Sequence, residues 1–244
     1  MTETTTAPNL KVNIFEDRRQ MGLNAATAAA TRLNALLKAQ PEVNVIFAAA
    51  PSQNEFLEAL IALEIDWTRI NAFHMDEYIG LDANAPQGFG NFLSSRLFDK
   101  VPFKSINYLK GVEYAFLLEQ FPVDMVCMGI GENGHIAFND PPVADFEDAQ
   151  SVKVVELDLV CRQQQVNDGC FAALEEVPTH ALTLTIPALL KAKHIICVVP
   201  GLAKAQAVWN TLNENISTDY PSTILRSHPD VLLFLDQDSS SLLK

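Results

Sequence analysis

The residues best suited to chemistry lie in one glycine-rich segment, GIGENGHIAFNDPP at 129–142. Its glycines have the G-x-G-x-x-G spacing that binds dinucleotides when a strand precedes it and a helix follows. Pro141 comes seven residues after Gly134, too early for that helix. We therefore reject a dinucleotide site and interpret the glycines as bends that bring the backbone close to a ligand. His135, in this loop, is then a candidate catalytic acid or base.

A pair of carboxylates follows another apolar run, Ile70–His74. Side chains alternate along a strand, so Asp76 and Glu77 are expected to point in opposite directions. One of them can then face a ligand while the other makes a structural bond. A carboxylate at a strand end can act as a general base, although an acidic surface turn is the more common role of such a pair.

Three further residues are candidate anion-binding groups. Ser52 and Glu55 fit an S-x-x-E capping box, which sequence alone favours, but the same helix start also fits a phosphate seat. Lys204 lies in the first turn of a helix, where the helix dipole disfavours a cation, so a functional role is indicated. Arg162 opens another helix, and a ligand-binding role and a solvated surface charge are about equally expected there.

These residues follow strand-like runs that alternate with amphipathic segments. Asp17–Lys38 has apolar residues at helical spacing up to Pro41, and Leu159–Leu174 is also expected to be a helix. The runs at 43–50, 123–128 and 194–201 are short, apolar and rich in β-branched residues, as buried parallel strands are. The runs at 151–157 and 180–186 are expected to be further strands.

This alternation predicts an α/β fold with a single doubly wound, mostly parallel sheet and helices on both faces, Rossmann-like but without a dinucleotide site. Ligands bind such sheets beyond the carboxyl ends of the strands, which is where the candidate residues lie. We expect residues 1–9 to form a flexible tail and residues 10–244 to form one domain.

The composition limits the classes of partner. The chain has 244 residues, a formal net charge of −13 and a pI of about 4.7, which disfavours nucleic acid and anionic membranes. No apolar run is long enough to span a bilayer, and the first residues do not resemble a secretory signal. The four cysteines form no C-x-x-C pair, so we expect a reduced, cytoplasmic setting. A chain of this length can bury a large core, so we expect a fold that requires no disulfide and no metal.

Taken together, these segments resemble the glucosamine-6-phosphate deaminase (isomerase) family. The similarity is carried by FHMDEYIGL, GIGENGHIAFNDP, THALTLTI, VVPGLAKAQAV and ILRSHPDVLLFLDQD, whose order and spacing agree from about Val43 to the C-terminus. Tyr78, after the D-E pair, favours this branch over the related 6-phosphogluconolactonases, which usually carry an arginine there. The resemblance implies that an amino-sugar phosphate opens its ring, moves a proton between C2 and C1, and loses ammonia to give a ketose phosphate. It implies no metal and no organic cofactor.

The resemblance also implies roles for residues at the expected catalytic centre. Asp76 matches the base that moves the C2 proton, and His135 matches the acid/base that opens the ring. Asp140 stands where the family has a glutamate that orients this histidine.

Other positions match the family's phosphate-binding groups. Lys204 and Arg162 correspond to phosphate ligands, and Ser52 and Gln53 lie in the loop that the family uses as a phosphate seat. A small-molecule sugar phosphate is therefore the expected partner. A homo-oligomer stays open, because relatives are monomers or larger rings.

This chain departs from the family pattern around the histidine and in the phosphate loop. Asn133 replaces the usual aspartate of D-G-H, and Asp140 is one methylene shorter than the usual glutamate. Pro51–Asn54 replaces a loop rich in threonine and glycine. Beside a deaminase acting on glucosamine 6-phosphate or galactosamine 6-phosphate, two alternatives therefore stay open: a 6-phosphogluconolactonase-like hydrolase and a non-enzymatic sugar-phosphate sensor.

Overall fold

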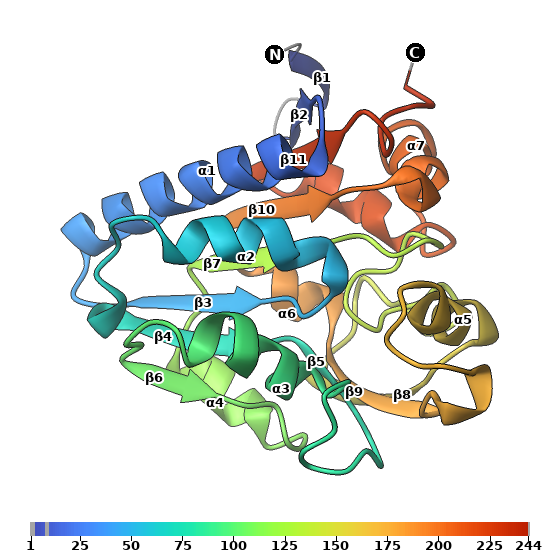
Figure 1. The fold of residues 1–244 in the computed structure, drawn as a ribbon, viewed down its shortest axis with the longest axis horizontal. Coiled ribbons are helices and arrows are strands. Elements are labelled where there is room, and N and C mark those ends of the chain that lie inside the picture. The colour runs from blue at the N-terminus through green and yellow to red at the C-terminus, as the bar shows by residue number, and fades with distance from the viewer. Residues whose placement is uncertain (1–2, 8–9, 244) are drawn as a thin grey trace.

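The main sheet of the computed structural model, which describes residues 3–7 and 10–243, has eight strands. Their order is β1-β2-β11-β10-β7-β3-β4-β6, and every neighbouring pair is parallel except β1 with β2 (Figure 1). The mostly parallel α/β sheet predicted from the alternation of strands and helices is confirmed.

The chain alternates between strands and helices along most of its length. The strands are β1 (Glu3–Ala7), β2 (Leu10–Phe15), β3 (Val43–Phe47), β4 (Ile70–His74), β5 (Asp76–Tyr78), β6 (Ser105–Asn107), β7 (Met125–Met128), β8 (Val152–Glu156), β9 (His180–Leu184), β10 (His194–Val199) and β11 (Val231–Asp236). The α-helices are α1 (Arg18–Ala39), α2 (Asn54–Ile61), α3 (Phe89–Leu93), α4 (Tyr114–Gln120), α5 (Leu159–Asn167), α6 (Ile186–Leu190) and α7 (Ala205–Asn213).

Helices cover both faces of the main sheet, because its strands are apolar on both sides. On the face toward the viewer in Figure 1, α1 and α2 pack with α3 against side chains such as Val45 and Phe47 of β3. Ile46 of the same strand points to the opposite face, into the core that contains residues of α4, α6 and α7. None of the helices in the described residues combines the length and the apolar character needed to cross a bilayer.

The predicted strands at 151–157 and 180–186 do form, but they lie outside the main sheet. They are β8 and β9 of a separate antiparallel sheet with the order β5-β9-β8. The expectation of one single sheet is corrected here. Burial separates β8 from the central strands of the main sheet, since Val154 of this edge strand is 53% exposed whereas every residue of β3 is buried.

One local expectation is also corrected. The helix expected over Leu159–Leu174 ends at Asn167, shortly before Gly169, whose φ of +74° is a conformation that glycine accepts easily. Glu3–Ala7, within the stretch expected to be a tail, forms β1 and pairs with β2. Residues 1–2 and 8–9 of that expected tail lie outside the described residues.

Candidate active site

One pocket lies where four neighbouring strands of the main sheet end. Strands β10, β7, β3 and β4 are adjacent, and the segments that follow their carboxyl ends line this pocket. It brings together five residues that the sequence had indicated: Ser52, Gln53, Asp76, His135 and Lys204. These residues are far apart in the sequence, and parallel pairing of the strands carries them to one edge of the sheet.

His135 is held from one side by two side chains. Its Nδ1 lies 2.8 Å from Asn133 Oδ1 and 2.9 Å from Asp140 Oδ1. Asn133 Nδ2 donates to the same Asp140 oxygen at 2.8 Å, which orients the amide so that its oxygen faces the imidazole. Both groups facing Nδ1 are acceptors, so we assign the proton to Nδ1. Nε2 is then the ring nitrogen that can exchange a proton with a ligand.

His135, Asn133 and Asp140, here called the relay, contact one another although Asn133 and Asp140 both differ from the family pattern. The shorter Asp140 side chain still reaches the imidazole directly. Burial opposes ionisation of Asp140, but the His135 imidazole and the hydrogen bonds from His135 and Asn133 lower the pKa of this carboxyl below its usual value. Asp140 is therefore a buried anion that favours one orientation of the histidine ring.

The backbone of the loop leaves room for that ring. A Cβ atom at Gly131 would overlap the ring of His135, so only glycine fits there. Gly134, directly before the histidine, has a φ of +85°, and Ala137 has a φ of +50°. A left-handed conformation is unfavourable for alanine, so the contacts of the loop must hold Ala137 in place.

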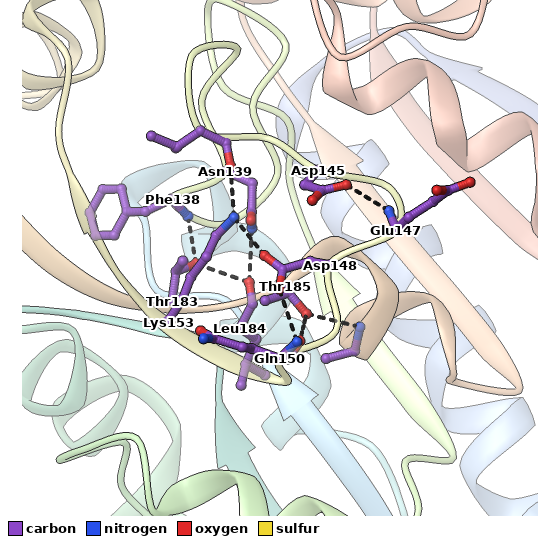
Figure 2. A network of polar contacts seen from close by, with 12 residues as sticks. Phe138, Asn139, Asp145, Glu147, Asp148, Gln150, Lys153, Thr183, Leu184 and Thr185 are labelled. Atoms are coloured by element: carbon purple, nitrogen blue, oxygen red, sulfur yellow. Dashed lines mark hydrogen bonds and ion pairs between the residues drawn. The ribbon is translucent and has the colours of Figure 1, made fainter.

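The second sheet supplies these contacts (Figure 2). The Phe138 N–H donates to Thr183 Oγ1 at 3.0 Å, and Asn139 Nδ2 donates to the Leu184 carbonyl oxygen at 2.8 Å. Asn139 is fully buried, so losing these partners would leave polar groups unsatisfied. The loop that carries His135 is thus fastened to β9.

Asp76 and Glu77 point in opposite directions, as the alternation along a strand predicted. The Glu77 carboxylate accepts hydrogen bonds from the N–H groups of Phe89 at 2.9 Å and Gly90 at 2.8 Å, so it caps the start of α3. Asp76 is buried and lines the pocket. Burial, then the negative charges of Glu77 and Asp140, raise the pKa of Asp76 well above its usual value. A carboxylate in this state is a stronger base than one in water.

Lys204 is the cation of the pocket. It ends the short turn η5 (Leu202–Lys204) directly before α7, is only 5% exposed, and its Nζ has no hydrogen-bond partner. Burial lowers the pKa of Lys204, and the carboxylates of Asp168 and Glu132 partly oppose this shift. A buried ammonium without a partner is unfavourable, and an anionic ligand would relieve the penalty.

The expected capping box between Ser52 and Glu55 does not form. Ser52 and Gln53 lie in the turn η1 (Pro51–Gln53), α2 has no side-chain cap, and Glu55 pairs with Arg18 at 2.8 Å. Gln53 Nε2 instead donates to Ser52 Oγ and to the Val198 carbonyl oxygen, both at 3.2 Å. Both residues line the pocket.

The fold and this pocket have counterparts among known proteins. The family model described as glucosamine-6-phosphate isomerases/6-phosphogluconolactonase matches residues 16–233. The chain belongs to this family. A glucosamine-6-phosphate deaminase of Exiguobacterium sp. is 36% identical over 186 residues, which are 72% of this chain and 71% of the relative. A glucosamine-6-phosphate deaminase of Streptococcus pneumoniae is 35% identical over 205 residues, which are 80% of this chain and 86% of the relative.

Solved structures of the family agree with the architecture. A monomeric glucosamine-6-phosphate deaminase superposes with a TM-score of 0.85 at 27% identity, covering 95% of this chain and 99% of that protein. A 6-phosphogluconolactonase from Thermotoga maritima superposes with a TM-score of 0.74 at 17% identity, covering 93% of this chain and all of that protein. The second similarity is one of fold alone.

In this member of the glucosamine-6-phosphate isomerase/6-phosphogluconolactonase family, Arg162 lies away from the other candidates. Its guanidinium donates to the carbonyl oxygens of Leu174 at 2.7 Å and Val177 at 2.9 Å. These bonds brace the turn η4 (Leu174–Glu176) against α5, and Arg162 does not line the pocket. The structure thus does not bring it together with Lys204.

Three pocket residues were missed by the sequence interpretation. Gln164, Gln165 and Asp168 line the pocket from α5 and the residue after it. The signal for two of them is the i, i+4 spacing of Gln164 and Asp168, which places both on one face of a helix. That spacing does not say which face meets a pocket, so the structure was needed to identify them.

One group of side chains in the described residues could in principle hold a metal ion. Donor atoms of His135, Asp140 and Cys161 all lie within 4.8 Å of one another. However, His135 Nδ1 already faces the acceptors Asn133 and Asp140, and burial followed by the Asp140 charge raises the pKa of the Cys161 thiol. A protonated thiol is a poor metal ligand, so we assign no metal to these residues.

Proposed function

We propose that this chain converts an amino-sugar phosphate, glucosamine 6-phosphate or galactosamine 6-phosphate, into a ketohexose 6-phosphate and ammonia. One observation carries the proposal: a buried carboxylate with a raised pKa, an imidazole held by a carboxylate, and an unpartnered buried ammonium face the same pocket. Family membership and the activity in the names of the relatives from Exiguobacterium sp. and Streptococcus pneumoniae support the same reaction class.

The proposed roles follow from chemistry. Lys204 holds the phosphate, with Ser52 and Gln53 at the same end of the pocket. Nε2 of His135 takes the proton of the C1 hydroxyl and delivers it to the ring oxygen, so that the bond between C1 and the ring oxygen breaks and the sugar opens to an aldehyde. Asp76 then takes the proton from C2, and the electron pair moves toward the C1 carbonyl.

The remaining steps complete the balance of atoms. Asp76 returns a proton to C1, the C1 oxygen takes up a proton that the amine gives up, and an imine remains at C2. Water adds to that carbon, ammonia leaves, and the C2 ketone remains. The aldehyde itself acidifies the C2–H bond, so the proposal includes no metal and no organic cofactor.

Ammonia release tests this proposal. Purified protein is assayed with glucosamine 6-phosphate and galactosamine 6-phosphate beside Asp76→Asn. Asp66→Asn is the matched control, because Asp66 is an exposed carboxylate just before β4, at the opposite end of the strands from the pocket. We expect release by the wild type and the control and almost none by Asp76→Asn. Absence of release from both hexosamine phosphates would refute the proposal.

A lactonase is the second candidate, favoured by the amide of Asn133 where the family usually has a carboxylate. Lactone hydrolysis needs a base for water but no proton transfer at C2. Turnover of a 6-phosphogluconolactone, with no entry of solvent deuterium at C2 of a hexosamine phosphate, would select it. Ligand-induced thermal stabilisation without any turnover would instead select a sugar-phosphate sensor.

We also propose a cytoplasmic setting, and a homo-oligomer stays a hypothesis. All four cysteines, Cys127, Cys161, Cys170 and Cys197, are free thiols in the structure. Reduced thiols suit a reducing compartment. The mass of the purified protein in solution would decide the oligomeric state.

A further inference from the structure

The part of the pocket around Lys204, here called the anion end, contains one cation, Lys204, and one carboxylate, Asp168. Among the described residues that line the pocket, Lys204 is the only lysine or arginine, since Arg162 is bound to carbonyl groups elsewhere. Asp168 lines the same pocket, and it is the carboxylate whose charge acts most strongly on Lys204. A phosphate bound at Lys204 would therefore also meet Asp168.

Asp168 is fixed at this end of the pocket by its neighbours. It is the residue that ends α5, and its Oδ2 accepts a hydrogen bond from Gln164 Nε2 at 3.3 Å. Gln164 Oε1 in turn accepts a bond from the Glu132 N–H at 2.8 Å, in the loop that carries His135. Gln164 is buried, so this chain of bonds ties the carboxylate to the wall of the pocket.

The electrostatics at this end disfavour a doubly charged anion. Lys204 supplies one positive charge, Asp168 supplies one negative charge, and the carboxyl end of α5 adds a partial negative charge. Glu132 adds a further negative charge from the loop after β7, and the Cys170 thiol lies near Asp168 beyond α5. The side chains from η1 on the other wall, Ser52 and Gln53, are neutral.

A singly ionised phosphate monoester matches this arrangement better. It carries one negative charge for the ammonium and one P–O–H group that can donate to a carboxylate. A phosphate monoester takes up its second proton near pH 6, so both forms exist around neutrality.

We propose that Asp168 is a specificity-determining residue that makes this pocket select the singly ionised phosphate, whose P–O–H group donates to Asp168 while a P–O⁻ oxygen pairs with Lys204. The proposal rests on the phosphate-binding role of Lys204 in the proposed function. It gives the substrate a preferred ionisation state, which neither the fold nor the family establishes.

The test measures binding alone, with a ligand that cannot react. Glucitol 6-phosphate has no aldehyde, and calorimetry gives its Kd at pH 5.5 and at pH 7.5. A monoester with a pKa near 6 is about three-quarters singly ionised at pH 5.5 and about 3% at pH 7.5. We therefore expect the wild-type Kd to rise about 25-fold between these values, because the binding form decreases by that factor.

Three comparisons show whether Asp168 causes this change. In Asp168→Asn, the Kd should change by less than about 3-fold over the same range, and binding at pH 7.5 should be tighter than in the wild type. Asp66→Asn should behave as the wild type. Glucitol 6-sulfate has one permanent charge and no proton to lose, so its Kd should barely change with pH.

Several results would overturn the proposal. One is an equal pH response in Asp168→Asn and the wild type. Another is a sulfate ester that responds to pH as the phosphate does, because the pH response would then come from the protein and not from the phosphate. Thermal unfolding checks that the variant is folded, and Asp168→Ser must give the same flattening. Phosphate that fails to bind at either pH would refute the proposed role of Lys204 as well, whereas binding without pH dependence refutes only the role of Asp168.

Discussion

Replacing Lys204 with methionine should make the free protein more stable while removing its affinity for sugar phosphates. The ammonium is 5% exposed and its Nζ has no hydrogen-bond partner, so the free protein keeps a buried, unsatisfied charge. Methionine has a similar length, fills the same space and has no charge to desolvate. The two effects have opposite signs, which an ordinary structural lysine would not show.

The size of each effect follows from this burial. A buried donor without a partner costs about 1–3 kcal/mol, more if charged, and a domain of this size gains about 2–4 °C in Tm per kcal/mol. We therefore expect Lys204→Met to raise the Tm of the free protein by about 2–12 °C. Loss of a buried charge partner costs about 2–5 kcal/mol in binding, so the Kd for glucitol 6-phosphate should rise by at least about 30-fold.

The stability gain should depend on pH in a defined direction. Burial lowers the pKa of Lys204 in the folded state, so between the folded and unfolded pKa values the unfolded chain binds more protons. The penalty is thus complete below the folded pKa and disappears as the pH rises toward the ordinary lysine value near 10.4. The advantage of Lys204→Met should accordingly be greater at neutral pH than in alkaline buffer.

Differential scanning calorimetry without ligand, repeated with glucitol 6-phosphate, measures both effects. Lys100→Met is the matched control, because Lys100 is exposed and does not line the pocket. It should change neither the Tm nor the ligand-induced shift by much. A Lys204→Met protein that is less stable than the wild type, or that keeps its ligand-induced shift, would show that Lys204 has a structural partner and is not the phosphate ligand.

Three further variants test other parts of the site. Asn133→Asp adds a carboxylate beside His135 and favours the imidazolium, so the limb of the pH–rate profile that reports this histidine should move to higher pH. An unchanged profile would show that Asn133 does not influence the histidine. Gly131→Ala places a methyl group in the space of the His135 ring, so kcat/KM for the hexosamine phosphate should fall at least about 100-fold, and near-normal activity would mean that the ring sits elsewhere. Arg162→Met removes the hydrogen bonds to the Leu174 and Val177 carbonyls, so it should lower the Tm but change KM by less than about 2-fold. A large rise in KM would show that Arg162 binds the phosphate.

The parts of the site that the sequence predicts are those set by strand geometry. A strand alternates its side chains, so Asp76 and Glu77 had to separate, and they do. Parallel strands end at one edge, so His135 and Lys204 were expected near Asp76 although they are far apart in the chain. These expectations depend only on where the strands lie in the sequence and on which end of each strand is the carboxyl end. The hydrophobic pattern predicts the positions of the strands.

The parts that the sequence does not predict depend on contacts between elements. The pattern of β9 identifies a strand, but its partners are β5 and β8 and not the main sheet. The position of Arg162 at a helix start does not show that its long side chain turns back to the carbonyls of η4. Asp168 was missed because a helical pattern does not say which neighbour covers each face.

Ser52 and Ala137 show the same influence of tertiary contacts. The S-x-x-E pattern at Ser52 fits a cap, but Glu55 pairs instead with Arg18 of the adjacent helix α1. Ala137 adopts a left-handed backbone, which its residue type does not predict, because β9 fixes the residues on its C-terminal side. Tertiary contacts outweigh a local preference of about 1–2 kcal/mol in such cases.

The central claim is that Asp76 moves the C2 proton of an amino-sugar phosphate. The most direct measurement runs glucosamine 6-phosphate with the enzyme in D₂O and follows ammonia release together with deuterium in the ketose phosphate by NMR. We expect ammonia and, because the proton on Asp76 can exchange with D₂O before it reaches C1, deuterium at C1 of the product with the wild type and with Asp66→Asn, and neither with Asp76→Asn. Ammonia release that persists in Asp76→Asn at the wild-type rate would contradict it.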